Sequence, residues 1–407
     1  MVRSDDAATT TQRSLRTLNL DTEFRYQRIG PLSKTVDAVV IGLGAMGCQT
    51  LFSLAERDVN VLGIDQFNPP HPQGSSHGES RLIRLAYFEH PDYVPLLRQS
   101  LKRWLELEEL SGAKLFENCG VLTGGADSSP LIRGLEQSIQ ANQLDLESVS
   151  ADDLQRRFPG FQWPSHWKSY FEPETGFLHA ERSIAATLNL AKDRGAEIWA
   201  DTQVRDVQCS GNSIAISTDQ GFVTAGNVVL CLGPWAPLWR QHIDLQLTTL
   251  RKTLLWYPPS SASQRLERGM PGFLCDTGEA IFYGMPAYES HGVKVARHDG
   301  GSRMDPGMAP PDCSGEIEVT DDFARSYFSP GLRNRARVEY CRYTMSPDGH
   351  FCFGTSIQLP QLFYLAGLSG HGFKFSCRLG QLLADWLIDG QIPCEAEFLR
   401  SARFGRT

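Results

Sequence analysis

TVDAVVIGLGAMGCQTLFSLAERDVNVLGID, residues 35–65, contains three consecutive patterns. Residues 36–41 form an apolar run rich in β-branched side chains, which ends at a glycine. Residues 45–57 carry apolar side chains at helical spacing, and residues 59–64 form a second apolar run that is followed by Asp65. We therefore predict a strand, a helix and a second strand, the β-α-β unit of a Rossmann-like α/β domain.

The glycines of this stretch predict a dinucleotide site. Gly42, Gly44 and Gly47 form a G-x-G-x-x-G motif between the first strand and the helix, where free backbone N–H groups and the helix dipole favour phosphate. Asp65, 18 residues after Gly47, is placed to accept a hydrogen bond from a ribose hydroxyl. The motif leaves FAD and NAD open, and the acid disfavours the 2′-phosphate of NADP.

Length and composition limit the protein class. A chain of 407 residues exceeds one ordinary core, so we expect two domains. The apolar content of 41% and charged content of 21% are those of a soluble globular protein. The net charge, 39 minus 47 or −8, argues against a nucleic-acid partner. No apolar run approaches the roughly 20 residues of a membrane helix, so we expect no membrane span.

The ten cysteines form no C-x-x-C pair, which argues against a zinc site and a disulfide framework. No two histidines stand at metal-ligand spacing with an accompanying acid, so we predict no metal site. A reduced, cytoplasmic protein is expected, in which most cysteines are inert core residues.

The remaining chain predicts two interleaved domains. Residues 1–35 mix arginines with acids in a Ser/Thr-rich stretch, which we interpret as a poorly ordered extension rather than an organelle presequence. Residues 91–110 are amphipathic, and residues 362–390 repeat the order of strand, glycine-rich turn and helix. Residues 246–344 show β-like alternation. We assign segments 36–115, 175–245 and 345–395 to the cofactor domain, and segments 116–174 and 246–344 to a β-rich substrate domain.

Four basic residues are candidates for anion binding. Arg81 and Arg84 lie among apolar side chains, and a partly buried arginine needs an anion, although surface arginines are more common. Lys374 follows a glycine-rich turn at a helix start, where a surface lysine is an equal alternative. Lys294 lies on a strand between two valines, and a solvated strand face is the usual explanation.

Four stretches, VVIGLGAMGC followed by GID, GSSHGESRLIRLAY, CRYTMSPDGHF and AGLSGHGFKF, carry a family resemblance. In this order and spacing the chain resembles the monomeric sarcosine oxidase family of flavoenzymes, with N-methyltryptophan oxidase and L-pipecolate oxidase as relatives. The resemblance runs from about residue 36 to about residue 395. It implies an FAD-binding domain with a β-rich substrate domain packed over the flavin.

The resemblance also implies roles for individual residues. Cys341 corresponds to the cysteine whose sulfur is joined to the 8α-methyl group of FAD, the alternative being one more buried thiol. Lys374 and Arg84 correspond to the clamp on the substrate carboxylate, and Lys294 to a lysine that activates oxygen. Further residues are implied near the flavin (His77, Arg81), on the substrate side (His298, Tyr283, Tyr343) and in contact with FAD (Gly42, Gly44, Ala45, Met46, Gly47, Asp65, Gln66, Ser75, Ser76, Val204, Gly233, Gly370, His371, Gly372, Phe373, Lys374).

The expected reaction is oxidation of the C–N bond of a secondary N-methyl or cyclic α-amino acid to an imine, with O2 reduced to H2O2 by a monomeric enzyme. The substrate stays open because Arg342, Gly354 and Leu274 depart from residues common in relatives. Three alternatives remain: a pipecolate-like, proline-like or biosynthetic-intermediate substrate, a dehydrogenase with another electron acceptor, and a flavoprotein that has lost catalysis.

Overall fold

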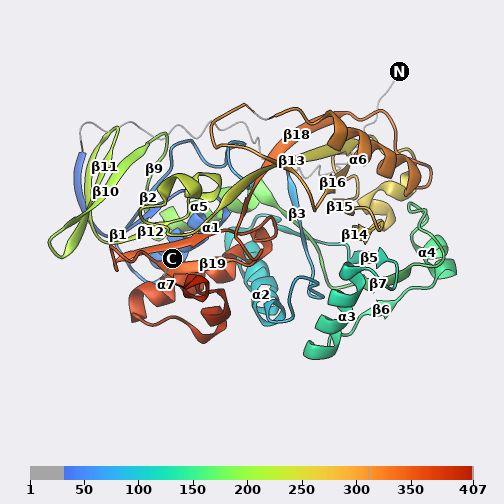
Figure 1. Ribbon diagram of the computed structural model, residues 1–407, viewed down its shortest axis with the longest axis horizontal. Helices are drawn as coiled ribbons and strands as arrows, with labels where there is room; N and C mark the ends of the chain where they lie inside the picture. Colours follow the sequence, from blue (N-terminus) through green and yellow to red (C-terminus); the bar gives the residue numbers. More distant parts are fainter. Residues whose placement is uncertain (1–31, 310, 406–407) are drawn as a thin grey trace, which may run out of the picture.

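The computed structural model describes residues 32–309 and 311–405, which build two main sheets (Figure 1). Residues 1–31 of the predicted extension lie outside the described residues. The first strand begins at Leu32 rather than at residue 36, because residues 32–36 already pair in parallel with residues 221–225.

The first sheet contains the predicted β-α-β unit. Its parallel centre is β12, β1, β2 and β9, and β20 pairs in parallel with the end of β12. The strands are β1 (Leu32–Ile41), β2 (Val61–Ile64), β9 (Glu197–Trp199), β10 (Val204–Ser210), β11 (Ser213–Thr218), β12 (Gly221–Leu230), β19 (Cys352–Thr355) and β20 (Leu362–Ala366). Side chains on both faces of β1 are buried, as its continuous apolar run predicts.

Helices cover one face of this sheet. α1 (Ala45–Ala55) packs against α5 (Ala180–Asp193) and α7 (Ser376–Asp389), and α2 (Tyr93–Ser111) packs against α7. Ala38 and Val40 of β1 join this helix-side core, whereas Val39 and Ile41 join the core on the opposite face. The two faces of β1 thus belong to two different cores. The glycine motif follows the carboxyl end of β1 and lies where the chain leaves the sheet and enters α1.

The second sheet is mostly antiparallel and lies beside the first (Figure 1). Its strands are β5 (Val121–Gly125), β6 (Glu147–Ser148), β7 (Lys168–Glu172), β13 (Thr248–Tyr257), β14 (Gly272–Asp276), β15 (Ile281–Met285), β16 (Val293–Arg297), β17 (Ser302–Arg303) and β18 (Arg337–Met345). A small third sheet has the strand order β3 (Ser80–Ile83), β8 (Gly176–His179) and β4 (Phe116–Asn118). The division of the chain into two domains stays a prediction.

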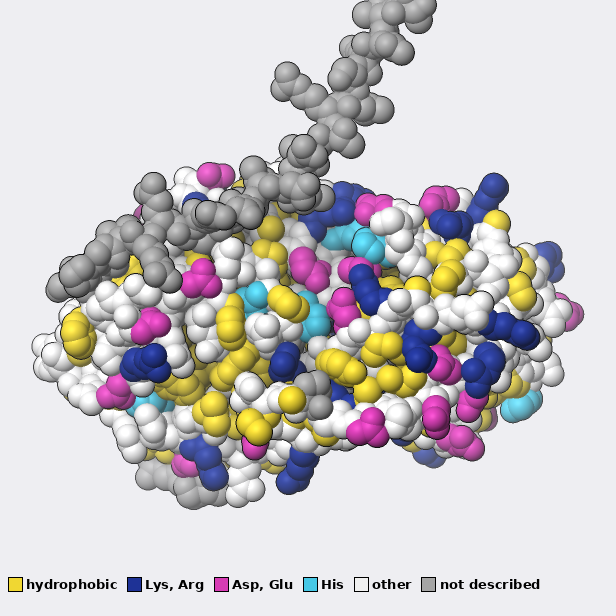
Figure 2. Space-filling view, turned by 90° about the horizontal axis from the view of Figure 1, so that it is seen from above, with side chains coloured by type: hydrophobic (Ala, Val, Ile, Leu, Met, Phe, Trp, Pro, Cys, Tyr) yellow, Lys and Arg dark blue, Asp and Glu magenta, His cyan; other side chains and the backbone are white. Residues whose placement is uncertain are grey.

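Three helices of the β-rich region were missed by the sequence analysis: α3 (Pro130–Asn142), α4 (Ala151–Arg157) and α6 (Ser314–Ser326). α3 had a readable signal, because Ser129 precedes Pro130 and its hydroxyl accepts the Ile132 N–H at 3.0 Å. Acidic and basic side chains lie interspersed on the face in Figure 2. No helix in the described ranges is long and apolar enough to cross a membrane.

Candidate active site

A long cleft opens at the carboxyl ends of β1, β2 and β12. Most of the predicted cofactor residues line it: Gly42, Gly44, Ala45, Met46, Asp65, Gln66, Ser75, Ser76, Arg81, Val204, Gly233, Gly370, Gly372 and Phe373. Gly47, His77, Cys341, His371 and Lys374 do not line this cleft. The structure thus gathers residues from five distant chain segments at one place.

Glycine is needed at the three motif positions for different physical reasons. A Cβ on Gly47 would lie 1.7 Å from the Gly42 carbonyl oxygen, so Gly47 is required by the close packing of helix and strand. Gly42 has φ +89°, which a side chain rarely adopts. A Cβ on Gly44 would meet only Ser76 Oγ, at 3.5 Å, and would otherwise point into the cleft. The missing side chain of Gly44 therefore leaves room for a ligand in the cleft and is not required by packing within the protein.

Polar groups at this end of the cleft suit a dinucleotide. The Asp65 carboxylate accepts the Leu43 N–H at 2.7 Å and the Phe67 N–H at 2.9 Å. Asp65 is thereby fixed at the end of β2, with lone pairs left for a ribose hydroxyl. The N-terminus of α1 faces the cleft, and only the Ala45 N–H there bonds a side chain of the described residues, Ser76 Oγ at 3.2 Å. The residues present fit the pyrophosphate of FAD.

A second, smaller cavity adjoins the cleft and shares Arg81, Tyr343, Gly370 and Phe373 with it. Its other lining residues are Leu82, Arg84, Phe88, Glu89, Leu274, Tyr283, His298, His371 and Lys374. All the residues that were predicted to contact the substrate line this cavity, and Lys294 does not.

Arg84 is buried beside this cavity, as its apolar neighbours predicted. Its guanidinium donates to the Ala86 carbonyl at 2.5 Å and pairs with Glu89 at 3.0 Å, and it lies over the Tyr87 and Phe88 rings. Burial alone would raise the pKa of Glu89, but the charge of Arg84 holds the pKa at about 2. Arg84 and Glu89 are therefore an ionised pair at the cavity wall.

Lys374 lies in the short 3-10 helix η4 (Phe373–Phe375), which follows the turn after β20. Its Nζ donates to the His371 carbonyl at 3.0 Å, and its own carbonyl accepts the Trp104 indole N–H at 2.9 Å from α2. Burial, followed by the nearby charge of Arg84, lowers the pKa of Lys374 to about 7. The ammonium is thus desolvated and lacks a carboxylate partner of its own among the described residues.

Arg81 is a further cation of the cavity wall, and the histidines and tyrosines of this wall are neutral. The His371 ring contacts the Tyr87 hydroxyl at 2.5 Å and the Gly349 carbonyl at 3.0 Å, and burial lowers the pKa of His371 to about 3. Burial also lowers the pKa of His298 to about 4. Two tyrosines, Tyr283 and Tyr343, face each other with their hydroxyl oxygens 3.4 Å apart.

Cys341 is buried on β18 and lines neither the cleft nor the smaller cavity. Its Sγ lies 3.5 Å from the Ser75 carbonyl and 3.7 Å from Arg81 Nη2. The same guanidinium donates to the carbonyls of Ser75 at 2.8 Å and His77 at 2.6 Å. Cys341 thus contacts the loop that lines the cofactor cleft, and a cation lies next to its sulfur.

Lys294 is fully buried, so the solvated strand face is wrong for this residue. Its Nζ donates to the carbonyls of Gly78 at 2.6 Å and Ser80 at 2.9 Å and lies over the Trp256 ring. Burial, followed by the charge of Arg81, lowers the pKa of Lys294 to about 7. Lys294 reaches the same loop as Cys341, from β16.

Sequence reasoning missed three residues of this region. Glu89 is the ion-pair partner of Arg84. The sequence carried a signal for it, because a buried arginine needs an anion and Glu89 is the first acid after Arg84. Lys252 is buried, donates to the Asp299 and Gly300 carbonyls, and lies opposite Cys341 in the β13–β18 ladder. Nothing in the sequence pattern singles it out. Glu172 accepts the Leu85 and Ala86 N–H groups at 2.7 and 3.1 Å, and so fixes the segment after Arg84.

Comparison with known proteins gives the same result as the geometry. The family described as DAO, FAD dependent oxidoreductase, matches residues 37–386. The monomeric sarcosine oxidase of Bacillus sp. (strain B-0618) is 31% identical over 371 residues, covering 88% of this chain and 94% of the relative. The N-methyl-L-tryptophan oxidase of Yersinia pestis (strain Pestoides F) is 30% identical and covers 90% and 99%.

Solved structures show the same fold. NikD, an unusual amino acid oxidase essential for nikkomycin biosynthesis, has a TM-score of 0.78 at 22% identity, over 90% of this chain and 97% of that chain. L-proline dehydrogenase from P. horikoshii has a TM-score of 0.79 at 20% identity, over 92% and 98%. The predicted mixed α/β fold of the FAD-dependent amino acid oxidase type is confirmed.

The family match covers most of the chain, and two relatives are at least 30% identical over nearly their whole length. The cleft at the glycine motif fits the cofactor of that family. The chain therefore belongs to the FAD dependent oxidoreductase family, as an FAD-dependent amine oxidase related to monomeric sarcosine oxidase and N-methyl-L-tryptophan oxidase.

Proposed function

We propose that this enzyme oxidises the C–N bond of a secondary N-methyl or cyclic α-amino acid to an imine, with O2 as the electron acceptor and H2O2 as the second product. The observation that carries the proposal is the pair of buried cations, Arg84 and Lys374, on the wall of the cavity next to the cofactor cleft. Three cations, Arg81, Arg84 and Lys374, face one carboxylate, Glu89, on this wall, so positive charge is in excess when all are ionised and favours a substrate carboxylate.

The cations orient the substrate. Lys374 offers its free donors, and a substrate carboxylate competes with Glu89 for the Arg84 guanidinium. Both cations favour the neutral form of a bound amine and so lower its pKa, and the neutral amine has the lone pair that oxidation requires. His298 and the two facing tyrosines, Tyr283 and Tyr343, line the remaining wall.

FAD, when bound, supplies the acceptor for the two electrons and the hydrogen that leave the substrate C–N bond. The chain would hold its pyrophosphate at the glycine motif, its ribose at Asp65, and its 8α-carbon through a thioether with Cys341. The contacts of Cys341 Sγ with the Ser75 carbonyl and with Arg81 Nη2 support the attachment, because they place the sulfur against the loop that lines the cofactor cleft.

Lys294 supports oxygen as the acceptor over a quinone or a partner protein. Superoxide is an anion, and the buried Lys294 ammonium, when protonated, provides a positive charge for it near the cofactor loop. We further propose a monomer in the cytoplasm. The name of the sarcosine oxidase relative supports the first part, and the ten free cysteines of the chain support a reducing compartment.

A screen of N-methyl and cyclic α-amino acids for peroxide release tests the reaction. Peroxide from at least one of these substrates is expected, together with yellow fluorescence that stays with the SDS-denatured chain and is lost in Cys341→Ser. Substrate oxidation that reduces an added quinone but yields no peroxide in air would replace the oxidase by a dehydrogenase. Oxidation only of amines that lack a carboxylate would contradict the role of Arg84 and Lys374.

A further inference from the structure

Two cations, Arg81 and Lys294, share the carbonyl groups of one loop, residues 75–80. The Lys294 ammonium donates to the carbonyls of Gly78 at 2.6 Å and Ser80 at 2.9 Å. The Arg81 guanidinium donates to the same Ser80 carbonyl at 2.8 Å and to two further carbonyls of the loop. The carbonyl side of this loop therefore carries a concentration of positive charge.

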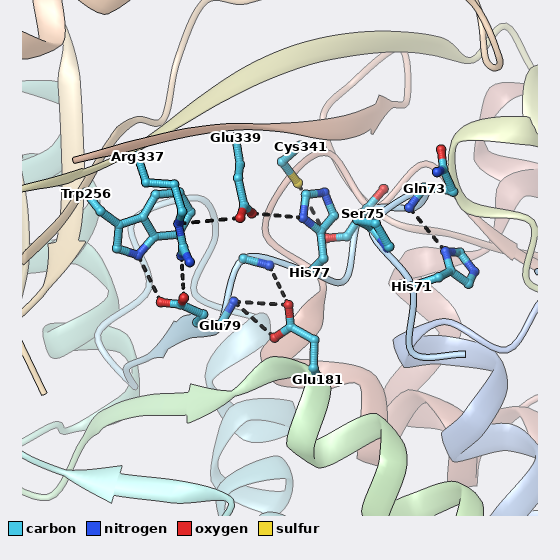
Figure 3. Close-up of polar contacts among 12 residues, drawn as sticks. His71, Gln73, Ser75, His77, Glu79, Glu181, Trp256, Arg337, Glu339 and Cys341 are labelled. Atoms are coloured by element: carbon cyan, nitrogen blue, oxygen red, sulfur yellow. Dashed lines mark hydrogen bonds and ion pairs between the residues drawn. The ribbon is translucent and has the colours of Figure 1, made fainter. Parts of the chain in front are cut away.

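A carboxylate lies on the N–H side of the same loop. Figure 3 shows Glu181 reaching the loop from α5. It accepts the backbone N–H groups of Gly78 at 2.6 Å and Glu79 at 3.0 Å. The Glu79 N–H and the Gly78 carbonyl belong to one peptide group, which thus has the Glu181 carboxylate at one end and the Lys294 ammonium at the other. Both charges polarise this peptide in the same direction.

The start of α5 fixes the orientation of this peptide. Gly78 has φ +84° and Glu79 has φ +70°, a left-handed conformation that non-glycine residues rarely adopt. Glu181 accepts the Glu79 N–H, and the Ala180 N–H donates to the Glu79 carbonyl at 2.8 Å. The first two residues of α5 thus hold both sides of Glu79, and with it the direction of the Gly78 carbonyl toward Lys294.

Glu181 differs from the other acids near Lys294 because it has no cation of its own. Glu79 and Glu339 both pair with the Arg337 guanidinium, which lies between them in Figure 3. In the part of the chain that the structure describes, Glu181 forms no ion pair, and its hydrogen-bond partners are the two backbone N–H groups. Its negative charge therefore remains available to the cations across the loop.

Lys294 needs such a charge because its ammonium is removed from water. Burial, followed by the charge of Arg81, lowers the pKa of Lys294 to about 7, and Glu181 is the largest influence in the opposite direction. The guanidinium of Arg81 stays charged at every pH used below. The charged and titratable groups that face Lys294 are Arg81 on β3, Glu79 in the loop, Glu181 on α5, and Glu339 and Cys341 on β18.

We propose that Glu181 is a positioning residue for Lys294: it fixes the Gly78–Glu79 peptide against the ammonium and, through that peptide, keeps the lysine charged during the reaction with oxygen. The inference rests on the proposed oxygen role of Lys294. Glu181 lines neither the cofactor cleft nor the smaller cavity, so its removal should leave the reduction of the enzyme by substrate unchanged.

The test is a double-mutant cycle in the full-length holoenzyme. Wild type, Glu181→Gln, Lys294→Met and the double variant are compared. Glutamine keeps a side-chain oxygen that accepts the same N–H groups, so this change removes the charge and preserves the contact. The control is Glu289→Gln, because Glu289 is an exposed acid that pairs with Arg182 and does not contact the loop.

Two measurements are made on each protein. Stopped-flow mixing of the reduced enzyme with O2 gives the reoxidation rate from pH 5.5 to 9. Denaturant unfolding of the oxidised enzyme at pH 5.5 and 8.5, followed by tryptophan fluorescence, gives the unfolding constant and does not depend on catalysis.

We expect the wild-type reoxidation rate to fall as the pH rises through 7, and the fall in Glu181→Gln to occur about one pH unit lower, the lower range for a lost opposite charge. The Glu181→Gln rate should then be about fivefold below wild type at pH 7 and nearly equal to it at pH 5.5. Glu181→Gln should also raise the unfolding constant about eightfold more at pH 5.5 than at pH 8.5, because Lys294 is protonated in the folded state only at the lower pH. Both pH dependences should disappear in the Lys294→Met background, and Glu289→Gln should match wild type.

Two kinds of result separate the inference from the proposed function. Equal pH midpoints in wild type and Glu181→Gln, or an effect of Glu181→Gln that persists in the Lys294→Met background, overturn the inference and leave the oxygen role of Lys294 intact. A wild-type reoxidation rate in Lys294→Met overturns the oxygen role, and the inference with it.

Discussion

Carboxylate binding should depend on pH through Lys374, and the replacement Lys374→Met should remove that dependence. Burial and Arg84 lower the pKa of Lys374 to about 7 in the ligand-free protein. A bound carboxylate adds an opposite charge next to the ammonium and raises that pKa again, by about 2 units for a close partner. The methionine side chain has similar length and no charge, so the cavity keeps its shape.

The sign and magnitude follow from proton linkage. Free enzyme loses the Lys374 proton above pH 7, whereas the complex keeps it to about pH 9, so binding takes up a proton in this window. The dissociation constant should therefore rise about 25-fold from pH 7 to 9, which corresponds to about 1.9 kcal/mol, with the steepest slope near pH 8. Lys374→Met should bind about 10- to 100-fold more weakly at pH 7, the usual loss of one charged hydrogen bond.

The assay is calorimetric titration with cyclopentanecarboxylate, an amine-free analogue of a cyclic amino acid that stays ionised over the whole range. Titrations at pH 8 in two buffers of different ionisation enthalpy report the proton uptake directly. Lys252→Met is the matched control. Lys252 is also buried, and burial lowers its pKa to about 8, but it lines neither cavity and should leave the slope unchanged.

Two results would refute the reasoning. A dissociation constant that stays constant from pH 6.5 to 9 in wild type would show that Lys374 does not contact the carboxylate or does not titrate. An unchanged slope in Lys374→Met would assign the titration to another group of the cavity.

Three further predictions concern the cofactor, oxygen and the amine. Gly44→Ala should leave the melting temperature of the apoprotein unchanged but weaken FAD binding more than about tenfold, because the added Cβ points into the cleft. Gly47→Ala should fail to fold, because its Cβ would overlap the Gly42 carbonyl oxygen. Equal melting temperatures of the Gly44→Ala and Gly47→Ala apoproteins would contradict the steric argument. Lys294→Met should slow reoxidation by O2 about 100-fold or more in stopped-flow measurements while anaerobic reduction by substrate changes little, and equal effects on both would reject the oxygen role. The kcat should rise with pH to a plateau as the bound amine loses its proton, so a flat profile between pH 6 and 9 would count against the neutral amine.

The β-α-β unit and its helix were predictable because they depend on local pattern. A strand buried on both faces needs a continuous apolar run, and the close approach of α1 to β1 needs a glycine at Gly47, whatever the rest of the chain does. The strands at residues 252–257, 281–285 and 293–297 were also recognisable by alternation. Their order in the sheet was not, since pairing joins residues far apart in sequence.

Site residues divide in the same way. Arg84 in an apolar segment already indicated a buried cation, and the structure supplied its partner, Glu89. The strand pattern alone favoured a solvated Lys294, whereas the family resemblance implied a site role, and only the packing of β16 against residues 78–80 buries it and lowers its pKa. The pattern of one strand shows which face a residue occupies, but the exposure of that face depends on what packs against it.

The sequence by itself determined the family, the cofactor class and the glycine motif, because these rest on residue types at fixed local spacing. Only the tertiary structure decided that residues 75–79 lie antiparallel to residues 337–341, more than 250 residues later, with His77 opposite Glu339. The physical reason is that ion pairing and desolvation depend on distance in space, and chain separation carries no information about either until the sheets have formed.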